Sequence, residues 1–384
     1  ATRNGGDRSM KLVPKRRFAG FTNEWNKQRF GDVLRSHAFN EFLAKPVEYG
    51  SFEVIQQGDA PIVGYADGNP YKGFEDIVLF GDHTLSLYKP TRPFFLATDG
   101  VKILSGDNID GSFLYTLIER YKPESQGYKR HFTILKDQIC MLTSDREEQQ
   151  KIGSFFKKLD ERIAMQESKV EKLKAMKSAY LNEMFPAEGE SVPKRRFAGF
   201  TDFWEQRRLG DLGDTFTGLS GKTKEDFGKG DAEFIPYLNV LNNPISDITF
   251  TEKVEVDKKQ NEVMFGDIFF TTSSETAEEV GMSSVWLDDR KNVYLNSFCF
   301  GYRVRDNLDP FYMAYALRSF PVRKQFILLA QGISRYNISK RKAMDVRIHL
   351  PQLEEQKAIG SFFKKLDERI AMQEAKVEKL KAMK

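Results

Sequence analysis

The chain contains few cysteines and no long apolar segment. Its 384 residues include only Cys140 and Cys299, too few for a disulfide scaffold or a four-ligand zinc site, so we expect a reducing cytoplasm. No run of 18 apolar residues is present, which argues against a membrane span or a membrane partner. Residues 1–9 lack an initiator Met and an apolar signal core, and we interpret Met10 as the native start.

Catalytic motifs are missing as well. Gly221-Lys222-Thr223 resembles the end of a phosphate-binding loop, but Phe216 stands where the first glycine belongs. Neither Asn242–Ile245 nor Asn69–Tyr71 forms the Asn-Pro-Pro-aromatic tetrad of an amino-methyltransferase. The four histidines are too widely spaced for a helical metal-ligand pair. The sequence therefore favours a recognition protein over an enzyme, and we expect neither a metal nor a cofactor in this chain.

The charge balance permits a nucleic-acid partner without requiring one. The chain has 59 basic and 55 acidic side chains, a net charge of +4. Its hydrophobic fraction of 40% is enough for folded cores and excludes a largely disordered protein.

Two copies of one sequence pattern follow each other along the chain. Val13–Thr22 recurs unchanged as Val192–Thr201, 179 positions later. Ile152–Lys177 recurs as Ile359–Lys384, 207 positions later, with 25 of 26 residues identical. Weaker matches between these anchors, such as Asn108-Ile109-Asp110 with Asn307-Leu308-Asp309, show an offset that rises steadily from 179 to 207. Two diverged copies of one fold with loop insertions give this drift.

Each copy is predicted to be an α+β domain with a mainly antiparallel sheet. Short strand-like runs alternate with Gly, Asn and Asp, and one helix is expected near the end of each copy, at Phe113–Arg120 and Phe311–Phe320. The expected organisation is a first domain over 13–146, a long helix over 147–186, a linker and second domain over 187–353, and a second long helix over 354–384.

The two long helices have the four-three apolar spacing of a coiled coil. A helix of this length cannot bury its apolar stripe on one small domain, so the second stripe is its expected partner, in an antiparallel pair with pseudo-twofold symmetry. The second stripe stops before the counterparts of Ser178–Pro186, which suggests a trimmed C-terminus. The predicted seam residues are Ile152, Phe156, Leu159, Ile163, Gln166, Val170, Leu173, Ile359, Phe363, Leu366, Ile370, Gln373, Val377 and Leu380.

Two motifs in this arrangement resemble one family. Pro351–Gln356, followed by Ile359, Phe363 and Leu366, resembles the entry to the conserved helix of type I restriction-modification specificity subunits. Phe197–Thr201 resembles the opening of a target-recognition domain of that family. The likeness covers nearly all of the chain from Val13, and the order domain, helix, domain, helix is more specific than either motif. The first copy departs at Ser144-Asp145-Arg146, opposite Pro351-Gln352-Leu353 in the second.

The resemblance implies a noncatalytic subunit that supplies the DNA sequence specificity of a modification and restriction complex. Each domain would read one half of a bipartite site in double-stranded DNA, and the helices would set the distance between the halves. Two methyltransferase (M) subunits would dock on the repeated parts, together with restriction endonuclease (R) subunits. S-adenosylmethionine and ATP would bind to those partners.

Candidate base-reading residues are the polar and basic residues in loops where the two copies differ. Arg can bind guanine and Gln or Asn can bind adenine, but phosphates accept the same side chains, and plain surface exposure is open for each. The strongest choices are the loops Tyr128–His131 and Ser334–Asn337, which follow equivalent glycines. The full set is Gln56, Gln57, Lys72, His83, Thr84, Tyr128, Lys129, Arg130, His131, Lys222, Thr223, Ser273, Ser274, Ser334, Arg335, Tyr336 and Asn337.

Some alternatives stay open at this point. The repeated basic runs Lys15-Arg16-Arg17 and Lys194-Arg195-Arg196 do not differ, so they cannot discriminate two half-sites. A phosphate contact, a partner contact and a solvated charge run are each compatible with them. The rival functions are a coiled-coil scaffold with two protein-binding heads and a self-contained modifying enzyme.

Overall fold

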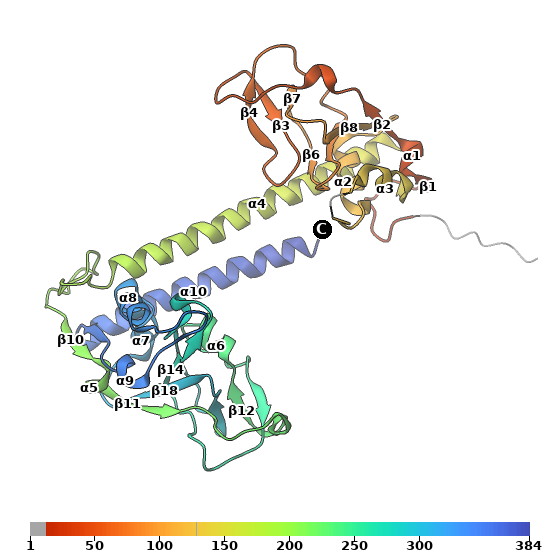
Figure 1. Cartoon of the computed structure of the whole chain (residues 1–384). Coiled ribbons are helices and arrows are strands. Elements are labelled where there is room, and N and C mark those ends of the chain that lie inside the picture. Colours follow the sequence, from red (N-terminus) through yellow and green to blue (C-terminus); the bar gives the residue numbers. More distant parts are fainter. Residues whose placement is uncertain (1–12, 128) are drawn as a thin grey trace, which may run out of the picture. The chain divides into compact units, whose positions relative to one another are not determined.

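The computed structural model describes residues 13–127 and 129–384. The chain divides into two compact units (Figure 1), unit 1 with the residues up to Met165 and Leu380–Lys384, and unit 2 with Gln166–Lys379. The boundary lies inside the long helix α4 (Arg146–Glu183), so each unit contains part of both long helices.

Within its described residues, unit 1 contains three small sheets. The strand orders are β1-β9, β2-β8-β5-β6 and β4-β3-β7, and every pairing is antiparallel except β3 with β7. The elements before α4 are β1 (Asn26–Arg29), α1 (Phe30–Val33), β2 (Leu34–His37), η1 (Asn40–Phe42), β3 (Phe52–Ile55), β4 (Ile62–Ala66), β5 (Ile77–Gly81), β6 (Leu87–Tyr88), β7 (Phe94–Leu96), β8 (Val101–Gly106), α2 (Gly111–Tyr121), α3 (His131–Asp137) and β9 (Ile139–Leu142).

Unit 2 repeats these three sheets in the same order. Its sheets are β10-β20, β11-β18-β14-β16 and β13-β12-β17, with β12 and β17 parallel, and it adds the pair β15-β19. Its elements are β10 (Glu205–Arg208), α5 (Leu209–Leu212), β11 (Gly213–Thr217), η2 (Lys224–Asp226), β12 (Phe227–Ile235), α6 (Tyr237–Asn242), β13 (Glu252–Val254), β14 (Ile268–Thr271), β15 (Ser273–Ser274), η3 (Ala277–Glu279), β16 (Ser283–Val285), β17 (Val293–Leu295), β18 (Cys299–Val304), α7 (Pro310–Ala316), α8 (Phe320–Leu329), β19 (Tyr336–Asn337), α9 (Lys340–Ala343), β20 (Arg347–Leu350) and α10 (Leu353–Lys381).

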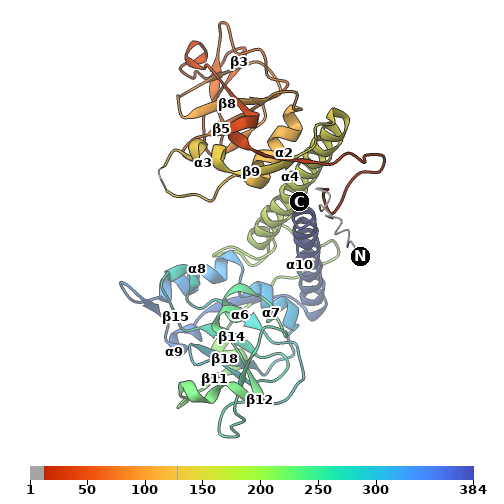
Figure 2. The ribbon, with the colours of Figure 1, turned by 90° about the vertical axis from the view of Figure 1, so that its right-hand side faces the viewer.

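In each four-stranded sheet, one of the two inner strands, β5 or β14, is buried on both faces. In β5, Val78 and Phe80 join the core beneath α2, whereas Ile77 and Leu79 face the core shared with the three-stranded sheet. Successive side chains of a strand point to opposite faces, so a strand between two cores is apolar throughout. In unit 2, β14 has the same place, with α6 beside it (Figure 2). The predicted α+β fold with a mainly antiparallel sheet is confirmed.

The equivalent helices α2 and α7 start alike but differ in length. Asp110 caps α2, accepting from the amides of Ser112 and Phe113, and Asp309 caps α7, accepting from the amide of Tyr312. The predicted helix Phe311–Phe320 is wrong at its end, because α7 stops at Ala316 and α8 starts anew at Phe320. Pro321 in the first turn of α8 explains this break, since proline has no amide hydrogen for a continuing helix.

A buried ion pair joins the start of each copy to its long helix. Arg17 donates to both carboxylate oxygens of Glu148 at 2.6 and 2.8 Å, and Arg196 donates to Glu355 at 2.7 and 2.8 Å. Burial opposes the charge of Glu148, but the hydrogen bonds from Arg17, Thr143 and Trp25 outweigh it and lower its pKa. The last arginine of each repeated basic run is therefore a structural residue, a role that the sequence did not suggest.

The long helices pack antiparallel, as predicted. In unit 2, Tyr180 of α4 lies against Phe362 of α10 with ring centroids 5.2 Å apart, and Lys177 lies 2.5 Å from Asp367. Farther along, Gln166 bonds to Gln373, its own counterpart in the repeat. The predicted seam residue Gln166 therefore has a polar partner, and so does Lys177 further along α4. Beyond α4, Phe185 stacks on Phe363 in the core of unit 2.

The buried pair generates a stability prediction. Glu148→Gln leaves Arg17 without its counter-charge and should cost about 3 kcal/mol of unfolding free energy in urea titrations, because one partner of a buried pair is removed. Because the pKa of Glu148 is lowered in the folded state, this stabilisation is present above the unfolded value of about 4.3 and is lost as the pH falls through the folded value. The neighbouring exposed Glu147→Gln is the control, and equal effects of the two variants would contradict the prediction.

Candidate nucleic-acid interface

Three loops meet at one corner of unit 1, beyond the ends of β3 and β5. The backbone amide of His83 donates to Gln57 Oε1 at 3.1 Å, and the amide of Gly58 donates to Ser86 Oγ at 2.8 Å. The ring Nδ1 of His83 lies 3.2 Å from the carbonyl oxygen of Lys129. The predicted residues Gln56, Gln57, His83, Thr84, Lys129 and Arg130 are thus brought together here, with Lys129 and Arg130 exposed.

His131 belongs to the support of this corner. It is fully buried, and its ring bonds to the carbonyl oxygen of Asp82 through Nδ1 at 3.1 Å. Its Nε2 accepts from the backbone amide of Gln126 at 3.1 Å, so Nδ1 carries the proton. The prediction that His131 contacts DNA is corrected, because its side chain is not accessible. Lys72 is exposed in the loop after β4, and Tyr128 lies outside the described residues.

The equivalent corner of unit 2 is built from the same three segments. After β12, Tyr237 donates its hydroxyl to the carbonyl oxygen of Ser273 at 3.0 Å, and β15, which contains Ser273, pairs with β19 (Tyr336–Asn337). Ser273 and Ser274 are only 9% and 7% exposed. The prediction that these two serines read bases is corrected, because they are buried. They support the exposed loop instead, since their strand β15 pairs with β19.

The exposed loop of this corner is a tight hairpin. Gln331 and Asn337 exchange backbone hydrogen bonds of 2.9 and 2.8 Å. Gly332 has a φ of +147°, and a Cβ there would lie 2.0 Å from the carbonyl oxygen of Arg335. The turn therefore requires glycine at this position. It presents Ser334 and Arg335 to solvent, while Tyr336 is half-buried.

Unpaired basic residues lie in the hairpin and on α9, the helix that follows it in the sequence. Arg335, Arg341 and Lys342 are exposed, and no ion pair involves them within residues 13–127 and 129–384. Lys340, half-buried at the start of α9, adds a further positive charge. An uncompensated positive surface beside polar loop residues is what phosphates and base edges require together.

Lys222 and Thr223 lie elsewhere in unit 2. Lys222 Nζ lies 3.0 Å from Asp257, and its hydrogen bond is the main cause that lowers the pKa of Asp257 to about 2. Thr223 caps η2 through a reciprocal pair of bonds with Asp226. The charge of Lys222 is thus already compensated, and the structure does not bring this loop to the hairpin.

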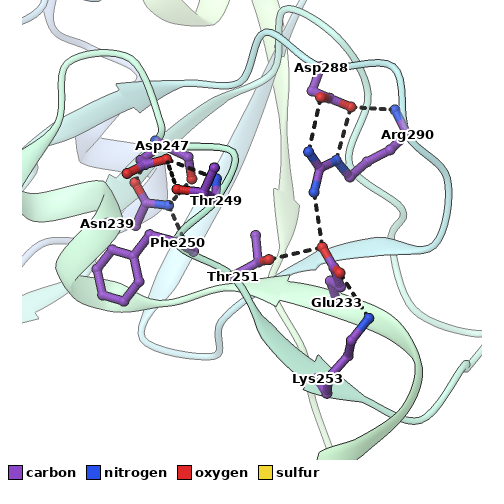
Figure 3. A network of polar contacts seen from close by, with 9 residues as sticks. All are labelled: Glu233, Asn239, Asp247, Thr249, Phe250, Thr251, Lys253, Asp288 and Arg290. Carbon is purple, nitrogen blue, oxygen red and sulfur yellow. Dashed lines mark hydrogen bonds and ion pairs between the residues drawn. The ribbon is translucent and has the colours of Figure 1, made fainter.

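A polar network that sequence reasoning missed anchors the three-stranded sheet of unit 2 (Figure 3). Glu233 accepts from Thr251 and Lys253 at 2.9 Å each and from Arg290 at 3.1 Å, and Arg290 also pairs with Asp288. These bonds, that of Lys253 first, lower the pKa of Glu233. Glu53 has the same register position in unit 1 and pairs with Arg92. The shared pattern Glu53-Val54-Ile55 and Glu233-Phe234-Ile235 was the available signal.

The described residues give little support for a metal site, a reactive thiol or a membrane helix. Across the described residues, no group of three His, Cys, Asp or Glu side chains is placed to hold a metal ion. Burial raises the pKa of Cys140 to about 11 and that of Cys299 to about 12, so both thiols stay protonated. Among the described helices, none has the length and apolar composition needed to cross a bilayer.

In the comparison with known proteins, one family model matches the second half of the chain. Residues 202–382 match the model of the type I restriction modification DNA specificity domain. Over 200 residues the chain is 26% identical to the putative type I restriction enzyme MjaX specificity subunit of Methanocaldococcus jannaschii, covering 50% of this chain and 46% of that protein. The match therefore spans about half the length of this curated relative.

Solved structures share the fold over nearly the whole length. The type I restriction-modification system S subunit from M. genitalium aligns with a TM-score of 0.58 at 14% identity, covering 97% of this chain and 96% of that one. A chain from a study of complex assembly and conformational transition of the type I R-M system aligns with a TM-score of 0.55 at 16% identity, covering 96% and 97%. At these identities the likeness shows the fold alone.

The contrast between Arg335 and Lys222 gives a prediction. Arg335→Ala should weaken binding to duplex DNA by about 1–3 kcal/mol, because an unpaired exposed cation is lost. Lys222→Ala should have a smaller effect, because Asp257 already compensates its charge. Electrophoretic binding at several salt concentrations checks both variants. A loss confined to one base position indicates base reading, and a uniform loss with a smaller salt slope indicates a phosphate contact. The idea fails if Lys222→Ala is the more damaging change.

Proposed function

We propose that the chain, whose residues 202–382 match the model of the type I restriction modification DNA specificity domain, is the DNA sequence-specificity subunit of a type I restriction-modification complex. It reads a bipartite site in double-stranded DNA, one half with each unit. It is noncatalytic, and methylation and cleavage belong to M and R subunits that bind S-adenosylmethionine and ATP.

One observation carries the proposal. The two units share their strand order and the buried Arg–Glu pair, and each corner is built from equivalent segments, yet the exposed residues at the corner differ. Unit 1 presents Lys129 and Arg130, whereas unit 2 presents Ser334 and Arg335. Matched supports with different exposed side chains suit two readers of different sequences. A scaffold that bound the same protein twice would have matching exposed residues.

The long helices are proposed as the spacer between the two readers. Lys177 pairs with Asp367 in unit 2, and the equivalent Lys384 pairs with Asp160 in unit 1 at 2.8 Å. With the bond between the equivalent Gln166 and Gln373, these contacts are those of a helix pair with internal twofold symmetry. A symmetric pair offers two equal docking surfaces, which supports two M subunits. The 38 residues of α4 extend about 57 Å at about 1.5 Å each.

The deciding experiment is sequencing of the methylation that the chain directs in cells with its M subunit. The proposal requires a single bipartite motif with a fixed spacer. Omitting the chain should abolish that motif, since the M subunit would lose its reader. Methylation without sequence preference would favour the scaffold alternative, and methylation by the isolated chain would show that it is itself an enzyme.

The first prediction from this proposal is modularity. Replacing Arg35–Arg146 by the corresponding domain of another family member should change one half of the methylated motif and leave the other half and the spacer intact, because each unit has its own core. Genome-wide methylation sequencing reads both halves at once. A change in both halves would show that the readers are not independent.

The second prediction treats the helices as a ruler. Deleting Ile163–Lys169 and Ile370–Lys376 removes one heptad from each helix and so preserves the heptad register. Each deleted heptad is centred on a seam glutamine, Gln166 or Gln373. Each helix shortens by about 10 Å, close to the length of about 3 base pairs. The DNA grooves turn by roughly 100° over that length, and a deleted heptad turns the helix face by about 20°.

The shortened protein should therefore read a spacer that is a few base pairs shorter or lose tight binding. The same methylation sequencing measures the spacer. Deleting four residues from each helix instead is the control, because it breaks the heptad and should abolish activity through misfolding of the pair. An unchanged spacer at unchanged methylation efficiency would reduce the helices to a docking surface.

A further inference from the structure

Ile333, at the tip of the hairpin in unit 2, is an aliphatic side chain almost fully in water. It is 97% exposed, the highest value among the large apolar side chains described as exposed. The base of the hairpin is rigid, because Gln331 and Asn337 exchange two backbone bonds and β19 pairs with β15. An apolar side chain that a fixed backbone holds in solvent adds nothing to the stability of the fold. We therefore interpret Ile333 as a binding residue.

The support of the hairpin extends into the core of unit 2. Ile338, directly after β19, is 3% exposed, and its amide donates to the carbonyl oxygen of Thr272 at 3.0 Å. Arg323 of α8 is buried and donates to the carbonyl oxygens of Glu278 and Val280 at 2.8 and 2.7 Å, which fixes the segment after β15. The tip is therefore preorganised, and binding through it requires little further ordering.

The positive charges in the hairpin and on the helix that follows it favour a polyanion over an apolar protein partner. Arg335 lies two residues from Ile333, and Arg341 and Lys342 follow on α9, all exposed and without an ion pair to a described residue. A narrow two-stranded hairpin fits the major groove of duplex DNA, which is about 12 Å wide. In that groove the C5 methyl group of thymine is the one apolar feature that a base pair presents.

We propose that Ile333 reads the C5 methyl group of a thymine in the half-site bound by unit 2, while Arg335 and Asn337 bind polar edges or phosphates beside it. The inference rests on the proposed function and adds a reading mode to it. Ile333 thereby determines specificity through apolar contact and selects thymine over cytosine at one position.

The test uses the complex of the full chain with its M subunit and duplexes that carry the methylated motif. Each thymine of the half-site assigned to unit 2 is replaced in turn by uracil, which removes only the methyl group. At one thymine the replacement should weaken binding about fourfold, the value for about 0.8 kcal/mol of one buried methyl group. Ile333→Ala should bind the thymine duplex about tenfold more weakly, within the range for a lost base contact.

The decisive readout is the coupling between the two changes. With Ile333→Ala, the uracil replacement at the same position should change binding by less than about 1.5-fold, because the partner of the methyl group is gone. Leu328→Ala is the matched control, since Leu328 is also strongly exposed, at 74%, but lies on α8 outside the hairpin. It should leave the full uracil effect in place. Thermal unfolding of both variants verifies that they are folded.

Three results would overturn the inference while the proposed function stands. The first is a half-site that contains no thymine. The second is an equal effect of the uracil replacement in wild type and in Ile333→Ala. The third is an Ile333→Ala chain that assembles poorly with the M subunit but binds DNA normally once assembled. The last result would make the tip a protein contact. A complex that shows no sequence preference at all would instead refute the proposed function itself.

Discussion

The structure depends on one interaction that occurs twice, the buried pair of Arg17 with Glu148 and of Arg196 with Glu355. Each pair joins the start of one sequence copy to the first turn of the long helix that follows that copy. Gln149 and Gln356 extend the joint, because their side chains accept from the amides of Asp110 and Asp309 at 2.9 and 3.0 Å. These aspartates cap α2 and α7, so helix start, cap and opening segment form one connected structure in each unit.

This joint leaves little freedom for the parts that it connects. Gly153 lies against the backbone of Ser112 and Phe113, where a Cβ would come within 2.6 Å of the amide of Phe113, and Gly360 lies against Tyr312 in the same way. The long helices α4 and α10 thus pack with their backbones close to the backbones of α2 and α7. Such close packing constrains the sequence at the ends of the two copies, which are nearly identical, whereas the exposed loops differ.

Much of this architecture could be predicted from the sequence. The repeat established two copies of an α+β domain, and the four-three spacing established an antiparallel pair of long helices. The roles of Arg17 and Arg196 could not be predicted, since a run of Lys and Arg looks the same in solvent and in an ion pair. The burial of His131 and Ser273 also escaped prediction, because polar residues in a loop give no sign of which side chain supports the loop. Whether the exposed residues contact DNA stays a prediction.

The hairpin of unit 2 has a consequence for how such a protein changes over generations. Its shape depends on backbone hydrogen bonds between Gln331 and Asn337 and on a single glycine, Gly332. Ser334 and Arg335, between these supports, have exposed side chains on which the turn does not depend. Random substitution there alters the chemistry offered to a ligand at almost no cost in folding stability. Variation at this corner is therefore nearly neutral for the fold, which leaves selection free to act on recognition alone.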